Sequence, residues 1–307
     1  MSKGQVIPVR VNTISAMHKI LGFPRPLHPL VSLVNYADIT TPYEEWPKAI
    51  LPNFYKISFK QNLSGRIKYG QDHYDFDEGG LSFIRPNQLI ACSDNEQDVS
   101  GYTLLFHADF LRGYPLDHKI KTFGFFHYSV NEALHLSDRE KKVIFTLFEN
   151  IQEELANAID DFSQDLIISY LEVLLNYSNR FYKRQFITRK HHSNDLLAKM
   201  EVVLTDYFAS DLTQTYGVPS VEYVAQHLHV SPRYLSDMLR SVTGQNAQQH
   251  IHAHLIEKAK EYLASCKLSV SEVAYRLGFE QPQSFNKLFK NKTNQTPVQF
   301  KQGFQRD

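Results

Sequence analysis

The stretch that decides the fold is a pattern that occurs twice in the last third of the chain. Residues 221–240 read VEYVAQHLHVSPRYLSDMLR, and residues 270–290 read VSEVAYRLGFEQPQSFNKLFK. Each copy opens with apolar residues at i, i+3, i+4 and i+7, the spacing of one helical face: Val221, Val224, Ala225 and Leu228, then Val270, Val273, Ala274 and Leu277. A second amphipathic segment follows after a short turn. This arrangement predicts two helix-turn-helix units, whose second helices fit the major groove of DNA.

The second helix of each copy has one apolar side and one polar side. Ser231 suits the N-cap of the first, and Pro232 and Pro282 suit the first helical position, where no N–H is needed. The inward residues are Leu235, Met238, Leu239 and Val242 in the first copy, and Phe285, Leu288 and Phe289 in the second. The outward residues are Arg233, Ser236, Asp237 and Arg240, then Gln283, Ser284, Asn286, Lys287 and Lys290.

These outward side chains have the chemistry of DNA contacts. Amide side chains bond adenine edges, arginine and lysine reach guanine, and a carboxylate accepts from cytosine N4. Those near helix ends or flanks are predicted to contact phosphates: Ser231, Arg240, Ser284 and Lys290. The alternative is a pair of ordinary solvated helix faces. The duplication of the whole unit favours DNA.

Residues 247–264 predict one longer helix between the two units. Its apolar side consists of Ile251, Leu255, Ala259, Tyr262 and Leu263. A rigid helix there would hold the units at a fixed separation, and successive major grooves on one face of B-DNA are about 34 Å apart. The predicted target is an asymmetric site of about two helical turns.

Residues 196–303 resemble the DNA-binding domain of the AraC/XylS family of bacterial transcription regulators. The resemblance rests on AYRLGF at 274–279, FNKLFK at 285–290 and TPVQF at 296–300. It implies base contacts by six residues: Arg233, Ser236, Asp237, Gln283, Asn286 and Lys287. It also implies a bacterial regulator that binds promoter DNA, with RNA polymerase as a further partner if the protein is an activator.

The chain departs from the family pattern at three places. Gln281 replaces the usual small N-cap, and Asn294 stands where glycine is common. Asparagine tolerates the left-handed conformation, so the second change is mild. Asp237 is an acid where many members carry a base, which puts the sequence preference in doubt but not the activity.

Composition is consistent with a two-domain cytoplasmic protein. The chain has 307 residues and a formal net charge of zero, yet residues 281–306 contain five basic residues and no acid. Its two cysteines, Cys92 and Cys266, fall in different predicted domains and suggest no disulfide framework. The sequence has no signal peptide and no apolar stretch of about 20 residues, so we expect no membrane partner.

The fold class we predict is α+β, in four segments. Residues 1–30 are interpreted as an N-terminal arm, and 31–182 as a sensor and dimerisation domain. This domain has short strands over 31–115, for example at 55–59, 82–84 and 101–106, and helices over 137–182. Residues 183–194 are interpreted as a linker, and 195–307 as the DNA-binding domain.

Gly80 followed by Pro86 resembles the second motif of the cupins, which often bind a metal through histidines. The position of the motif's histidine is Ala91, and His73 is the obvious candidate nearby, so the ligand set is incomplete. The family resemblance implies a metal-free cupin-like barrel, and we expect no cofactor and no enzyme activity. The alternative is a cupin-type metalloenzyme with an appended DNA-binding domain.

No motif in the sequence encodes an effector site in the barrel. Trp46, Tyr55 and Arg66 are the candidates for lining an apolar pocket with polar anchors, with Phe59, Tyr69 and Arg85 beside them. Each has the alternative of being an ordinary core aromatic or surface base.

Two apolar stripes follow a capping box at Ser137 and Glu140. They consist of Val143, Leu147, Ile151 and Leu155, and of Leu166, Ile167, Tyr170, Leu171, Leu174 and Leu175. The resemblance implies that these helices form a homodimer, and the alternative is packing within the chain only. Further on, His250, His252 and His254 are the densest histidine group, but they lack the intervening glutamate of a metalloprotease helix.

Overall fold

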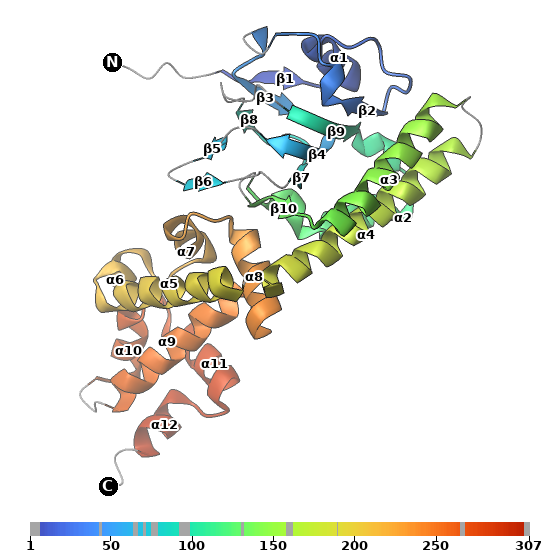
Figure 1. Ribbon diagram of the computed structural model, residues 1–307. Coiled ribbons are helices and arrows are strands. Elements are labelled where there is room, and N and C mark those ends of the chain that lie inside the picture. Colours follow the sequence, from blue (N-terminus) through green and yellow to red (C-terminus); the bar gives the residue numbers. More distant parts are fainter. Residues whose placement is uncertain are drawn as a thin grey trace, which may run out of the picture. The chain divides into compact units, whose positions relative to one another are not determined.

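The computed structural model divides into two compact units, Met1–Gln185 and Phe186–Asp307 (Figure 1). It describes residues 7–42, 45–63, 67–69, 72–74, 79–91, 99–129, 132–157, 162–188, 190–264 and 268–303. The division lies inside the segment that we interpreted as a linker. That segment is helical wherever it is described, because α4 (Ser163–Thr188) ends within it and α5 (Lys190–Ala209) begins within it. Cys92 and Cys266 lie outside the described residues.

The described strands of the N-terminal unit form three sheets. A five-stranded antiparallel sheet has the order β10-β7-β4-β9-β2, with β2 Val31–Asn35, β4 Tyr55–Leu63, β7 Gly80–Ile84, β9 Val99–Phe106 and β10 Leu134–His135. A three-stranded sheet has the order β1-β3-β8, with β1 Val9–Val11, β3 Ala49–Pro52 and β8 Ile90–Ala91. The third pairs β5 Ile67–Tyr69 with β6 Asp72–Tyr74. The strands expected at 55–59, 82–84 and 101–106 are confirmed, and a closed cupin-like barrel stays a prediction.

The segment interpreted as an N-terminal arm is part of the core, which corrects that prediction. β1 pairs in parallel with β3, and α1 (Ile14–Leu21) follows it directly. Ile14, Met17 and Leu21 are buried together with Leu105 of the five-stranded sheet. The apolar spacing at 14, 17 and 21 predicts a helical face; the prolines that follow it obscured the signal.

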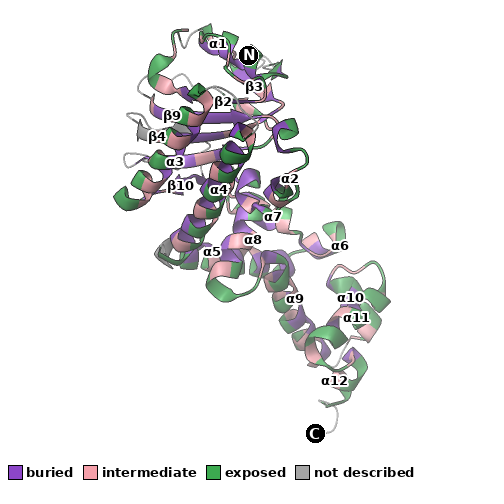
Figure 2. Cartoon of the chain, turned by 90° about the vertical axis from the view of Figure 1, so that its right-hand side faces the viewer, coloured by how far each residue is buried: buried purple, intermediate pink, exposed green. Residues whose placement is uncertain are grey.

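The two faces of the five-stranded sheet differ because side chains alternate along each strand. Ile57 and Phe59 of β4 are buried, and the ring of Phe59 stacks on Phe148 of α3 (Asp138–Ala156) at 6.1 Å between centroids. Lys56, Ser58 and Lys60 point to the opposite face. The buried residues of β4 and β9 can be followed in Figure 2.

The helices of the N-terminal unit include α2 (Pro115–Lys119), α3 and α4, with short 3-10 turns between them. The capping box at Ser137 and Glu140 is confirmed. The buried side of α3 consists of Ile144, Leu147, Phe148 and Ile151, so the predicted stripe was rotated slightly. On α4, Leu166 was predicted to be inward but is 44% exposed, whereas Ile167, Leu171, Leu174 and Leu175 are buried.

The C-terminal unit is entirely helical in its described part. After α5 come α6 (Leu212–Tyr216), α7 (Val221–His227), α8 (Pro232–Thr243), α9 (Ala247–Ala264), α10 (Val270–Arg276), α11 (Pro282–Thr293) and α12 (Pro297–Gly303). The helix predicted over 247–264 is α9, and it contacts α5, α7, α8, α10, α11 and α12 (Figure 1). Its residues Ile251, Leu255, Ala259 and Leu263 are fully buried. They form the centre of the unit's core.

Candidate nucleic-acid interface

The turns inside the two helix pairs have the same backbone geometry. In the first pair the Val230 amide donates to the Ala225 carbonyl at 3.0 Å, and in the second the Phe279 amide donates to the Ala274 carbonyl at 3.0 Å. The residue before each donor is left-handed, with φ of 57° at His229 and 90° at Gly278. This combination is a Schellman-type helix end, which satisfies carbonyls that the helix leaves unpaired. The first helix therefore ends at this turn, and the second helix begins a few residues later.

Gly278 is required by space as well as by conformation. A Cβ atom there would lie 2.5 Å from the carbonyl carbon of Gly217 and 2.8 Å from the Thr213 carbonyl oxygen, both backbone atoms. Gly217 belongs to the connection between α6 and α7. The turn of the second helix pair therefore packs, backbone against backbone, on the entry to the first.

The second helices differ at their N-termini. The hydroxyl oxygen of Ser231 accepts from the Tyr234 amide at 3.3 Å and caps α8. α11 begins after Gln281, whose side chain forms no capping hydrogen bond. Both helices have a proline in the first turn. The lack of a cap at Gln281 is what its larger side chain predicts.

The repeat extends further than the sequence pattern indicated. Thr243 at the end of α8 and Thr293 at the end of α11 each donate from the hydroxyl to the carbonyl four residues earlier, at 2.8 Å in both cases. Gln249 and Gln299 then each accept from the backbone amide three residues before them, at 2.8 and 2.9 Å. Matched threonines and glutamines 50 positions apart were the signal in the sequence.

The left-handed ends of α8 and α11 also correspond. Gly244 ends α8 with φ of 79°, and Asn294 ends α11 with φ of 59°. The conformation expected of Asn294 is thus confirmed. Each helix pair together with the start of the helix that follows it is one repeated structural unit.

The polar side of α8 is organised by a carboxylate. Asp237 Oδ2 lies 2.9 Å from Arg233 Nε, and Asp237 Oδ1 lies 3.8 Å from an Arg240 guanidinium nitrogen. The side chains of Arg233 and Arg240 are about half exposed, at 49% and 55%, whereas that of Asp237 is 20% exposed. The acid therefore lies beneath the two cations and holds them in place. Ser236 is half-buried beside it.

The polar side of α11 contains no acid. Gln283, Asn286 and Lys287 are exposed on it, as are Ser284 and Lys290 nearer its flanks. Phe285 and Phe289 are fully buried on the other side, as predicted, and Leu288 is half-buried. On α8, Leu235, Met238 and Leu239 are buried, but Val242, predicted to be inward, is 37% exposed. The last turn of α8 extends past the core, so its apolar stripe ends one turn early.

The three histidines of α9 do not converge. The His250 ring bonds the Thr243 hydroxyl at 2.8 Å, the His252 ring bonds the Gln248 amide at 2.8 Å, and the His254 ring lies 3.3 Å from a Glu201 oxygen. Burial lowers the pKa of His250 against the opposing effect of Glu201, and burial together with Lys292 lowers the pKa of His252. In the described part of the chain, no three histidine, cysteine or acidic side chains gather as metal ligands would.

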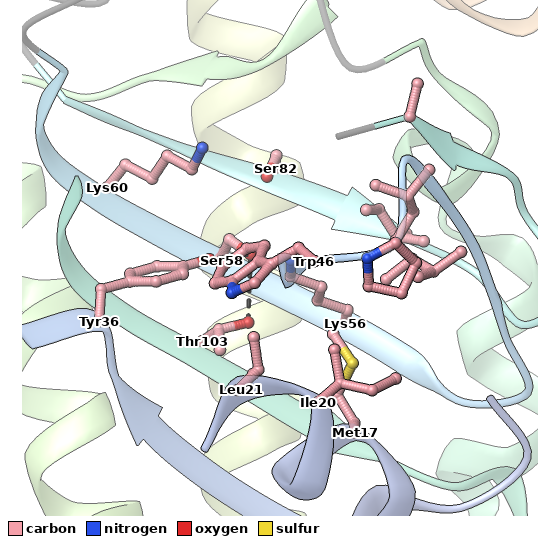
Figure 3. Close-up of a pocket in the computed structure, with 15 residues that line it drawn as sticks. Met17, Ile20, Leu21, Tyr36, Trp46, Lys56, Ser58, Lys60, Ser82 and Thr103 are labelled. Carbon is pink, nitrogen blue, oxygen red and sulfur yellow. Dashed lines mark hydrogen bonds between the residues drawn. The ribbon is translucent and has the colours of Figure 1, made fainter. Parts of the chain in front are cut away.

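Two of the effector candidates, Trp46 and Tyr55, are not brought together. Trp46 lines a cavity of about 70 Å³ in the N-terminal unit (Figure 3). Tyr55 belongs to the opposite face of β4, where its ring stacks on Phe106 at 5.0 Å. Arg66 lies outside the described residues. Sequence reasoning missed Lys56, Ser58 and Lys60, whose period-2 spacing places them on the cavity side.

Comparison with known proteins bears on the duplicated unit. Residues 224–303 match a family described as "Helix-turn-helix domain". The chain is 30% identical over 139 residues to the uncharacterised HTH-type transcriptional regulator YfiF of Bacillus subtilis, an alignment that covers 45% of this chain and 41% of YfiF. It is 27% identical over 276 residues to the HTH-type transcriptional activator RhaS of Escherichia coli, covering 84% of this chain and 90% of RhaS.

The C-terminal unit contains an AraC-type helix-turn-helix domain, and the chain is similar to transcription regulators of the AraC/XylS family.

This AraC-type chain is also similar to solved structures. One is the C-terminal domain of AraT, a response regulator from Geobacillus stearothermophilus, at 28% identity and a TM-score of 0.30 over 35% of this chain and 84% of that one. Another is ToxT of Vibrio cholerae, at 15% identity and a TM-score of 0.29 over 81% of this chain and 90% of that one. No helix in the described ranges is both long and apolar enough to cross a membrane.

Proposed function

We propose that this AraC-type regulator recognises an asymmetric promoter site through α8 and α11. The observation that carries the proposal is the repeated unit itself: two second helices, each preceded by the same kind of turn, both contact the buried helix α9. The proposed base readers are Arg233, Ser236 and Asp237 of α8, and Gln283, Asn286 and Lys287 of α11. The proposed phosphate contacts are Ser231, Arg240, Ser284 and Lys290.

The two helices are suited to different kinds of reading. Asp237 partly neutralises Arg233 and Arg240 and fixes their direction, so α8 presents a positioned, weakly basic face. Fixed arginine geometry favours specific contact with guanine. α11 presents amides and lysines with no acid between them. Its amides are suited to adenine edges, and its lysines would contribute more to the binding free energy through attraction to phosphates than the paired arginines of α8 do.

Enrichment of genomic DNA fragments by the full-length protein tests the proposal. The intact chain is expected to enrich fragments that share an asymmetric motif. Gln283→Ala should lose about 1–3 kcal/mol of discrimination at one position of that motif, whereas Gln226→Ala, an exposed glutamine of α7, should leave the motif unchanged. Equal losses by Gln283→Ala on the motif and on random DNA would remove Gln283 as a base reader.

A homodimer through α4 is the second part of the proposal. Leu166 and Val173 are 44% and 41% exposed on this helix, and the half-buried Tyr170 and Tyr177 continue the row. These positions follow the alternating spacing of three and four residues that is typical of a helix packed against another helix. A second copy of α4 would cover them. A dimer would bring two promoter-binding units to one regulatory region.

The N-terminal unit is proposed to be a cupin-like sensor that responds to a small molecule. Residues from both its five-stranded and its three-stranded sheet line the Trp46 cavity, which supports this reading. RhaS is named an activator, and on that likeness we propose that the chain contacts RNA polymerase and activates transcription in the cytoplasm. The rival function, a metalloenzyme, requires bound metal, so metal analysis of the purified protein separates the two.

A further inference from the structure

One wall of the Trp46 cavity is the face of the five-stranded sheet that carries hydroxyl groups. Ser58 of β4 is directly opposite Ser82 of β7 on one side and Thr103 of β9 on the other. The Tyr36 hydroxyl donates to Ser58 Oγ at 2.9 Å, and Ser58 Oγ and Thr103 Oγ1 are 3.2 Å apart. Ser82, Ser58 and Thr103 therefore form a row of hydroxyls across three neighbouring strands.

The buried hydroxyls of the row are hydrogen-bonded to one another and to Tyr36. Ser58 and Thr103 are each 2% exposed, at positions where alanine or valine would pack without polar atoms. Burying a hydroxyl costs free energy unless hydrogen bonds replace those it made with water. A row of this kind at a cavity surface is the arrangement expected of a site that binds a polar group.

The same face carries positive charge. Lys56 and Lys60 flank Ser58 at the two nearest positions on the same side of β4, and both line the cavity (Figure 3). No aspartate or glutamate is among the described residues that line it. Lys56 forms no ion pair with any acid in the described ranges of the chain. Burial would raise the pKa of the Tyr36 hydroxyl, but the two ammonium groups and the hydrogen bonds with Ser58 and Thr103 lower it.

The opposite wall is apolar. Met17, Ile20 and Leu21 of α1 form it together with Ile50, Ile90 and the indole ring of Trp46. The indole N–H is already used, because it donates to the Thr41 carbonyl at 3.2 Å. The cavity thus has a cationic, hydroxyl-bearing wall and an apolar wall, and its volume of about 70 Å³ limits it to a small ligand.

We propose that this cavity binds a small organic carboxylate, with its charged group against Lys56 and the hydroxyl row and its apolar part against Trp46 and α1. A neutral sugar is a poorer match, because it brings no negative charge to Lys56 and because a cavity of about 70 Å³ is small for a sugar ring. The claim that the carboxylate acts as an effector rests on the function proposed above. The claim that it binds in the cavity is independent of that function.

Trp46 provides the readout, because it is the single tryptophan of the chain. The full-length protein is titrated with sodium propionate and sodium butyrate, which suit a cavity of about 70 Å³, and with the neutral alcohols 1-propanol and 1-butanol. The expected result is a saturable change of tryptophan fluorescence with a dissociation constant in the millimolar range or tighter for at least one carboxylate. The alcohol of the same chain length should bind about tenfold more weakly or worse, as expected from losing one charge-assisted contact. Equal binding of acid and alcohol, or no saturable change with either acid, overturns the proposal.

Two variants locate the binding. Lys56→Met should weaken carboxylate binding about tenfold, whereas Lys48→Met, an exposed lysine near Trp46 that does not line the cavity, should have no effect. Ser82→Ala is the milder second variant and should weaken binding about fivefold, the cost of one hydrogen bond. Wild-type binding by both Lys56→Met and Ser82→Ala places the ligand elsewhere and overturns the proposal.

Promoter binding is measured on the same samples. The DNA-reading variant Gln283→Ala should bind the carboxylate like the wild type. Failure of the carboxylate site and failure of DNA recognition are therefore seen separately.

Discussion

His229 and Gly278 occupy the same place in the turns of the two helix pairs, with φ of 57° and 90°. A residue with a Cβ atom is strained in this conformation, and glycine is not. We expect His229→Gly to stabilise the C-terminal unit by about 0.5–1 kcal/mol. Gly278→Ala should destabilise it by more than about 2 kcal/mol, because strain is added to a clash with the backbone of Gly217. Urea unfolding of both variants measures the difference, and a Gly278→Ala protein of wild-type stability contradicts it.

The family resemblance implies that Asp237 contacts a base, but in the structure its carboxylate pairs with two arginines. Its carboxylate lies against Arg233 and Arg240, so Asp237→Asn should release two cations toward the DNA. We expect stronger binding to random-sequence DNA and a steeper dependence of affinity on salt, by up to about 0.9 in the log–log slope for each new phosphate contact. Glu222→Gln on α7 makes the same charge change away from this face. If both variants strengthen binding equally, the effect is one of net charge, not of the released arginines.

At the scale of the element, α8 and α11 differ in one cap. Ser231 caps α8, whereas Gln281 has an extended backbone suitable for a cap but no capping hydrogen bond. Gln281→Ser should therefore stabilise the C-terminal unit by about 0.5–1 kcal/mol, and Ser231→Ala should cost about 1 kcal/mol. Circular dichroism followed through urea unfolding gives both values. A Gln281→Ser protein less stable than the wild type would show that the turn before α11 leaves no room for the cap.

The exposed row on α4 predicts the oligomeric state. Val173→Glu places a charge in the centre of the proposed dimer contact, where its burial would be strongly unfavourable. Sedimentation equilibrium should show a shift from dimer to monomer. Val202→Glu is the matched control, because Val202 is 59% exposed on α5 and outside the row. A dimer that survives Val173→Glu but not Val202→Glu would place the contact on α5.

At the scale of the whole molecule, two compact units predict two unfolding transitions. A ligand stabilises the unit to which it binds in proportion to the logarithm of its free concentration over its dissociation constant. Promoter DNA should therefore raise the midpoint of one transition and leave the other unchanged. Calorimetry of the full-length chain measures both transitions. Gln283→Ala should reduce the shift, and a single cooperative transition would show that the units unfold together.

The sequence predicted the helix pairs well because their apolar spacing, proline positions and turn residues all agree with one structure. It predicted the sensor unit less well for a physical reason. Both faces of the five-stranded sheet are covered, so the alternation at 55–60 identified two faces but not which of them lines the cavity. Arg233 and Asp237 are four residues apart, a spacing that by itself predicts the ion pair that the structure contains.

Because Gly217 packs against Gly278, the spacing between the two helix pairs and the DNA sequence that they recognise depend on different residues. The spacing between the two helix pairs depends on a contact between backbone atoms and on the buried side of α9, neither of which includes a proposed reader. The outward side chains of α8 and α11 can therefore vary, and with them the promoter sequence that is recognised, while the distance between the two recognised segments stays the same. Descendants of this chain would acquire new target genes by surface substitutions alone, without redesigning the scaffold.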